Sequence, residues 1–130
     1  VALTVKSAPD ALMVPMDVDK LQQALINIVK NSLESIDGTG SIDIVLEKQP
    51  GDRAVVRISD TGAGLAPGEI EKIFDPDYTT KEKGLGLGLP IAYEIIRGHG
   101  GTIDVQSSQG RGTTFEISLP TQPAPAAAPR

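Results

Sequence analysis

Apolar and polar residues alternate along several short segments of the chain, which is the pattern of a half-buried β-strand. We expect strands at 2–7, 41–49, 53–60, 102–108 and 113–119. The turns "PGD" and "QGRG" separate the second segment from the third and the fourth from the fifth, so both pairs predict hairpins. A further short extended segment is expected at 11–17, where Pro15 favours a sheet edge.

Three other segments place their apolar residues at helical spacing. The first helix begins near Asp17 or Asp19 and stops at the "DGTG" of 37–40. One face of this helix carries Leu21, Leu25, Ile28, Val29, Ser32 and Ile36. Pro67 starts a short helix over 67–74. The third helix has the stripe Leu87, Ile91, Ala92, Ile95 and Ile96 and is ended by "GHGG".

This order of elements predicts an α/β fold, an α+β sandwich of two layers in which helices cover one face of a mixed, mostly antiparallel sheet. A chain of 130 residues suffices for one domain with its own core. We expect this domain to span 1–120 and the Pro/Ala-rich stretch 121–130 to be a disordered tail. About a dozen residues, 75–86, have no clear period, and a loop of that length is usually functional or disordered.

Composition narrows the choice of partners. The net charge is −5 and the basic residues are scattered, which argues against nucleic acid as a partner. The chain has no Cys and a single His, so disulfides, thiolate metal sites and His clusters are excluded. No apolar run is long enough to span a membrane, and we expect a cytoplasmic domain without direct membrane contact, whether or not its parent protein is anchored.

Two motifs contain side chains suited to ligand binding. Asn27 and Asn31 are four residues apart and share one helix face beside the apolar stripe. "SDTGAGL" follows a predicted strand, so that the Asp60 carboxylate can accept a ligand amino group while Gly62 and Gly64 allow close approach to the backbone. Taken singly, the amides could equally be solvated, and the second motif could be an ordinary turn.

Two further motifs follow later in the chain. "KGLGLGLPIA" places Gly84, Gly86 and Gly88 before a helix N-terminus, which suits either an anion site or a hinge. It lacks the Gly-Lys-Ser/Thr ending of a Walker A loop. "RGTTF", which contains Thr113, reads by itself as a β-turn entering a strand.

The order and spacing of these motifs, with "IFDPDYTTK" between them, resemble the ATP-binding catalytic domain of bacterial sensor histidine kinases. The resemblance covers about 1–120 and is strongest in "HGGTIDVQSSQGRGTTFEISLP". It implies the Bergerat fold that this family shares with the gyrase, heat-shock chaperone and mismatch-repair ATPases. It also implies ATP and Mg²⁺ as the ligands.

The resemblance also implies a role for each motif. Asn31 would be the Mg²⁺ ligand, and Asn27 and Lys81 would complete the catalytic set near the phosphates. Asp60 would accept from the adenine amino group, and Phe74 would anchor the base of a lid. The nucleotide-binding set would comprise Asn31, Asp60, Gly62, Gly64, Ile73, Phe74, Lys81, Gly84, Gly86, Leu87, Gly88, Leu89 and Thr113.

Two positions depart from the family pattern. Asp77 stands where an aromatic residue is common in the family. This difference bears on the details of the expected lid and not on the family resemblance. Asn27 stands where the water-using ATPases of the superfamily typically carry Glu, so the general base for water is absent. This favours phosphoryl transfer, which depends mainly on positioning and charge neutralisation, over ATP hydrolysis.

The resemblance implies two protein partners. One is a phosphoacceptor His on an upstream dimerisation domain, and the other is the receiver domain of a response regulator. His99 lies at a predicted helix end and is expected to cap that helix. Two alternatives stay open: a Ser-directed kinase of the anti-sigma-factor type, and a non-catalytic nucleotide-binding or interaction module.

Overall fold

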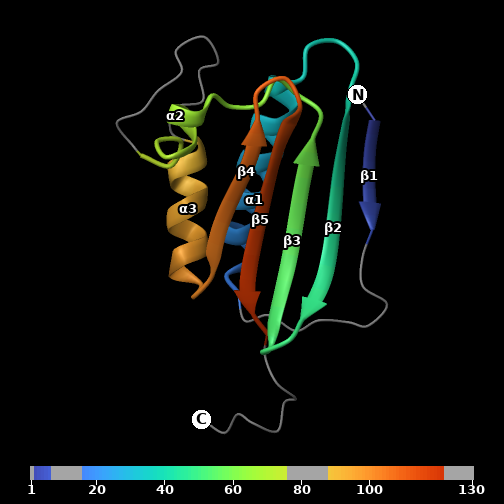
Figure 1. Cartoon of the computed structure of the whole chain (residues 1–130). Coiled ribbons are helices and arrows are strands. Elements are labelled where there is room, and N and C mark those ends of the chain that lie inside the picture. The colour runs from blue at the N-terminus through green and yellow to red at the C-terminus, as the bar shows by residue number, and fades with distance from the viewer. Residues whose placement is uncertain (1, 7–15, 76–87, 122–130) are drawn as a thin grey trace, which may run out of the picture.

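The computed structural model describes residues 2–6, 16–75 and 88–121. Figure 1 shows their arrangement, in which the helices lie behind the sheet and cover one of its faces. The strands are β1 (Ala2–Lys6), β2 (Ser41–Gln49), β3 (Arg53–Asp60), β4 (Thr102–Ser108) and β5 (Gly112–Pro120). The helices are α1 (Val18–Ser35), α2 (Pro67–Ile70) and α3 (Gly88–Gly98).

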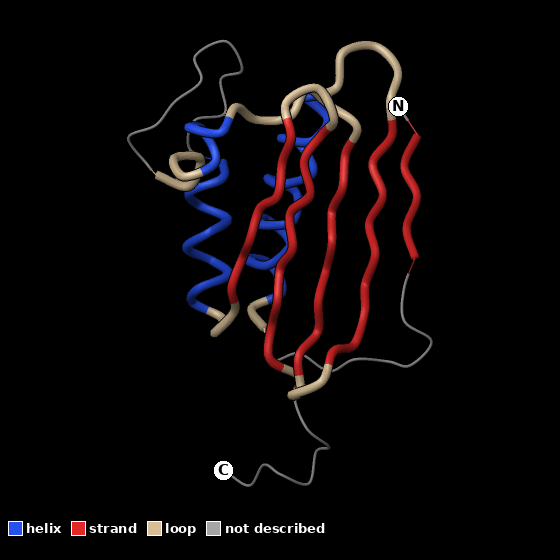
Figure 2. Tube along the Cα trace, in the orientation of Figure 1, coloured by secondary structure: helices blue, strands red, loops and turns tan. Residues whose placement is uncertain are grey.

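The strands form one five-stranded sheet in the order β1-β2-β3-β5-β4, as Figure 2 shows. Both expected hairpins are present, and β3 pairs with β5 between them in an antiparallel manner. Among the described strands, only the pairing of β1 with β2 is parallel. The predicted fold class, a mixed but mostly antiparallel sheet with helices on one face, is therefore confirmed.

The sequence of helix α1 explains both where the helix begins and which of its faces is buried. The Asp17 side chain accepts a hydrogen bond from the Lys20 N–H at 3.2 Å, so Asp17 is the N-cap, and Asp19 lies in the first turn. The helix ends at Ser35, just before the expected stop signal. Its buried residues are Leu21, Ala24, Ile28 and Ser32.

The core lies between the inner face of the sheet and the two longer helices, which pack against each other. Side chains from the centre of the sheet and from both helices are fully buried in it, among them Phe115, Ile117, Ile58, Ile28 and Ile96. Burial of each such side chain contributes about 1.5–3 kcal/mol to folding. Because α1 and α3 are fixed on one face, the residues between them are held in defined positions.

Two local predictions differ from the structure or fall outside it. The helix expected over 67–74 is helical only to Ile70, and the Lys72 N–H then bonds the Glu69 carbonyl three residues back, which makes a tighter turn. Of the extended segment expected at 11–17, residues 11–15 lie outside the described ranges. No helix within the described ranges is long and apolar enough to cross a membrane.

Candidate nucleotide-binding site

Asp60, the last residue of β3, is the best-defined side chain of the predicted site. It is only 6% exposed. Its Oδ1 accepts the Gly62 N–H at 2.8 Å and the Thr113 N–H at 3.3 Å, which fixes the orientation of the carboxylate. Its Oδ2 is buried and has no hydrogen-bond partner among the residues that the structure describes. One carboxylate oxygen therefore holds the site together, while the other can still accept a hydrogen bond.

The glycines after Asp60 hold the loop between α1 and the β4–β5 turn. A Cβ at Gly62 would collide with Ser35, the last residue of α1, and the Ala63 N–H donates to the Ser35 carbonyl at 3.0 Å. Gly64 has a positive φ of 74°, and a Cβ there would collide with the Ser108 carbonyl. Both glycines are thus required by the packing of the chain itself, whether or not a ligand is bound.

Thr113 forms the opposite side of the Asp60 cluster and is also 6% exposed. Its hydroxyl lies 2.8 Å from the Ser107 Oγ, which accepts the Leu65 N–H at 2.7 Å. Ser107 therefore links the glycine loop to β5, a role that the sequence analysis missed. The available signal was its place in β4, two residues after Val105 on the inward-facing side of the strand.

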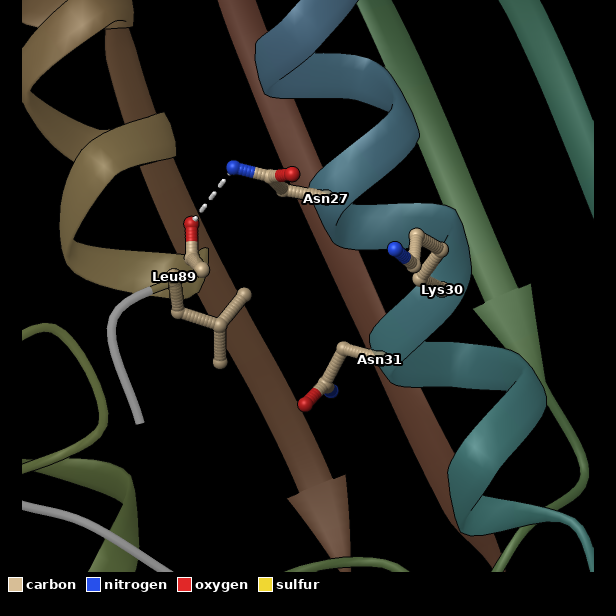
Figure 3. Close-up of a pocket in the computed structure, with 5 residues that line it drawn as sticks. Asn27, Lys30, Asn31 and Leu89 are labelled. Atoms are coloured by element: carbon tan, nitrogen blue, oxygen red, sulfur yellow. Dashed lines mark hydrogen bonds between the residues drawn. The ribbon is translucent and has the colours of Figure 1, made fainter. Parts of the chain in front are cut away.

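Asn27 and Asn31 lie together on α1, facing the N-terminal end of α3. Figure 3 shows their side chains pointing from α1 toward the turn of α3 that contains Leu89. Asn27, Lys30, Asn31, Gly88 and Leu89 line one pocket there. The Asn27 Nδ2–H donates to the Gly88 carbonyl at 3.1 Å, so this side chain also ties the two helices together.

Ile73 and Phe74 pack in and against the hydrophobic core. Ile73 is 5% exposed and belongs to the core. Phe74 stacks on Tyr93 of α3 with ring centroids 5.3 Å apart and meets Phe115 edge-on at 6.4 Å. The predicted site residues Lys81, Gly84, Gly86 and Leu87 lie outside the described residues, as does Asp77.

The described residues provide neutral oxygen ligands for a metal rather than a cluster of charges. No group of three His, Cys, Asp or Glu side chains able to hold a metal ion occurs in the described ranges. Asn31 presents an amide at the pocket between α1 and α3. Mg²⁺ is commonly held by few protein oxygens together with waters and substrate phosphates, so this donor set fits Mg²⁺ bound with a nucleotide.

His99 lies outside the site and has a structural role, as expected from its position at a helix end. Its Nδ1–H donates to the Ile95 carbonyl at 2.8 Å, and its Nε2 accepts the Asp17 N–H at 2.9 Å. The ring therefore caps α3 and at the same time holds the N-terminus of α1. Both ring nitrogens are engaged by backbone groups.

Comparison with known proteins identifies the family. The family model described as "Histidine kinase-, DNA gyrase B-, and HSP90-like ATPase" matches residues 16–123. The chain therefore belongs to this family. It is 41% identical over 104 residues to the sensor histidine kinase ZraS of Salmonella typhimurium, covering 80% of this chain but only 22% of that protein.

Solved structures agree with this assignment. The catalytic domain of the histidine kinase ThkA superposes with a TM-score of 0.82 at 32% identity, covering 92% of this chain and 78% of that one. A full-length ShkA structure in complex with AMPPNP superposes with a TM-score of 0.82 at 25% identity, covering 92% of this chain and 25% of that one. The chain is thus a histidine-kinase-type ATPase catalytic domain, and it spans about a fifth of the length of the curated relative.

Proposed function

We propose that this domain binds Mg-ATP and transfers the γ-phosphoryl group to a His on a separate dimerisation domain of its parent protein. The observation that carries the proposal is the state of Asp60. Two backbone N–H groups hold Oδ1, while Oδ2 is buried without a partner in the described part of the chain. A buried carboxylate oxygen in this state is suited to a ligand that donates, such as the 6-amino group of adenine.

The phosphates would lie toward the pocket between α1 and α3. Asn27 and Asn31 line this pocket beside Gly88 and Leu89. Asn31 would hold Mg²⁺ through its amide oxygen, and the metal when bound would neutralise charge on the transferred group. Lys81 and the backbone of Gly84, Gly86 and Leu87 are the proposed further phosphate contacts.

Transfer is favoured over hydrolysis because of Asn27. An amide cannot take a proton from water at neutral pH, and its N–H is committed to the Gly88 carbonyl at 3.1 Å. Phosphoryl transfer requires mainly that donor and acceptor be positioned and that charge be neutralised. The domain alone is therefore expected to bind ATP with little turnover until an acceptor is supplied.

The relatives support a His acceptor. ZraS and ThkA are both named histidine kinases, which favours a His acceptor over the Ser-directed alternative. The AMPPNP complex of ShkA supports nucleotide binding over a purely structural module. We propose that a response-regulator receiver domain then takes the phosphoryl group from the His, and that the domain acts in the cytoplasm.

The test has a binding arm and a transfer arm. Titration with ATP should give saturable binding that Mg²⁺ strengthens, and Asn31→Ala should remove the Mg²⁺ dependence while adenosine still binds. With the dimerisation domain and γ-labelled ATP, acid-labile phosphohistidine should form. Absence of binding at millimolar ATP would favour the non-catalytic alternative, and acid-stable label on Ser would favour the Ser-directed one.

A further inference from the structure

Lys30 is the one charged side chain among the described residues that line the pocket between α1 and α3. The other lining residues are all neutral, namely Asn27, Asn31, Gly88 and Leu89. Figure 3 shows Lys30 between the two amides along α1, with its ammonium nitrogen turned toward the side from which they project. The chain as a whole has a net charge of −5, and the proposed function gives this cation no role. A positive charge at this place therefore calls for an explanation.

The plain structural explanation would be an ion pair with a neighbour on the same helix. The candidate one turn later is Glu34, which is exposed like Lys30. No ion pair between Lys30 and a carboxylate occurs among the residues that the structure describes. Lys four residues before Glu is also the less favourable order for such a pair on a helix. The ammonium group is therefore available to a ligand in the pocket.

The position of Lys30 along α1 relates it to one end of a bound nucleotide. Ser35 marks the base end, because its carbonyl accepts the Ala63 N–H at 3.0 Å, three residues after Asp60. Lys30 is five residues before Ser35, which is about 7.5 Å along the helix axis. Asn31, the proposed Mg²⁺ ligand, lies between them. Lys30 is thus farther from the base than the metal ligand is, on the side where the phosphate chain would end.

We propose that the Lys30 ammonium group binds the terminal phosphate of ATP and so sets a preference of the site for a triphosphate over a diphosphate. The inference rests on the proposed function and deepens it. Mg²⁺ held by a neutral amide neutralises only part of the charge of a triphosphate. An ammonium group compensates further charge through strong hydrogen bonds to phosphate oxygens, and its flexible stem lets it reach them from the exposed side of α1. ADP lacks the phosphate in question and should bind without this contact.

The test compares ATP with ADP, both with Mg²⁺, on two variants of this side chain. Lys30→Met keeps the apolar stem and removes the charge, whereas Lys30→Arg keeps a cation. Lys30→Met should bind ATP about five- to tenfold more weakly than the wild type and ADP within about twofold of it. Lys30→Arg should recover ATP affinity to within about threefold of the wild type. Because Lys30 is exposed, thermal unfolding of both variants should match that of the wild type.

Lys20→Met is the matched control, since it removes the same charge from the same helix. Lys20 lines a different pocket together with Asp17 and His99, and lies about 22 Å from Ser35 along the axis of α1. Its loss should leave both affinities unchanged. The inference is overturned by unchanged ATP affinity in Lys30→Met, by an equal loss for ATP and ADP, by an equal loss in Lys20→Met, or by no recovery in Lys30→Arg. Failure of the proposed function would differ, because the wild type itself would then not bind ATP.

Discussion

At the scale of single residues, the two carboxylate oxygens of Asp60 have different roles, one in the folded structure and one in ligand binding. Its Oδ1 accepts two backbone N–H groups, and its Oδ2 remains for a ligand. Asp60→Asn keeps an acceptor for those N–H groups but presents an NH₂ donor in place of Oδ2. We expect ATP binding to fall tenfold or more, about 1.4 kcal/mol or above, because two donors would then face each other.

Calorimetric titration checks this prediction, and Asp104→Asn on the exposed side of β4 is the control. Each variant loses one negative charge, so a general electrostatic effect would strengthen the binding of anionic ATP in both. Equal affinity of Asp60→Asn and the wild type would show that the carboxylate does not contact the base.

Gly112 is a residue whose importance is structural. Its φ of +111° is a conformation that residues with a side chain rarely adopt, and a Cβ there would collide with the Asp60 carbonyl. We expect Gly112→Ala to lower the free energy of unfolding by about 2 kcal/mol or more. Denaturant unfolding measures the loss.

Gly68→Ala in α2 is the matched control, since an added Cβ there meets nothing within 4 Å. It should change stability by less than about 0.5 kcal/mol. A small effect at both positions would mean that the turn at Gly112 adjusts without cost.

At the scale of elements, α1 and α3 are linked at both ends of their contact. Asn27 bonds the Gly88 carbonyl at one end, and His99 accepts the Asp17 N–H at the other. His99→Ala removes this bond and the bond to the Ile95 carbonyl, so we expect a loss of about 1–2 kcal/mol of stability with ATP affinity within twofold of the wild type. Thermal unfolding and titration measure the two effects, with the exposed Glu94→Ala as the control.

A large loss of affinity in His99→Ala at unchanged stability would contradict the structural role of His99. It would place the ring in the nucleotide site rather than at the base of the two helices. The prediction therefore separates a capping His from a functional one.

Features of the fold and the site that depend on neighbouring residues could be predicted from the sequence, whereas features that join distant segments could not. The alternation within each hairpin and the helical stripe of α1 are local, and both were predicted correctly. The parallel pairing of β1 with β2, and the place of β5 between β3 and β4, join distant segments and leave no local pattern. Ser32 was correctly placed on the apolar face of α1, but only the structure shows that its hydroxyl lacks a partner among the described residues.

At the scale of the whole molecule, the two faces of the sheet have different roles. The helix-covered face holds Asp60, Thr113 and the core, whereas the open face carries charged pairs. Arg57 bonds the carboxylates of Glu47 and Glu116, and these bonds raise the pKa of its guanidinium above the usual value. Because these side chains are about 35–43% exposed, such pairs contribute under about 1 kcal/mol each. Nucleotide binding should therefore depend on side chains of the helix-covered face and not on the charged pairs of the open face.

The extent of the folded unit gives the last prediction. We propose that the domain closes at Thr121, because the Thr121 N–H donates to the Asp52 carbonyl at 2.8 Å, next to the β2–β3 turn. A chain of residues 1–121 should unfold at the same denaturant concentration as the full 130 residues. A chain ending at residue 117 also loses Leu119, which is 4% exposed, and should be less stable by about 2–4 kcal/mol. Equal stability of all three chains would show that the end of β5 does not support the core, and a loss already in 1–121 would extend the domain into the Pro/Ala-rich stretch.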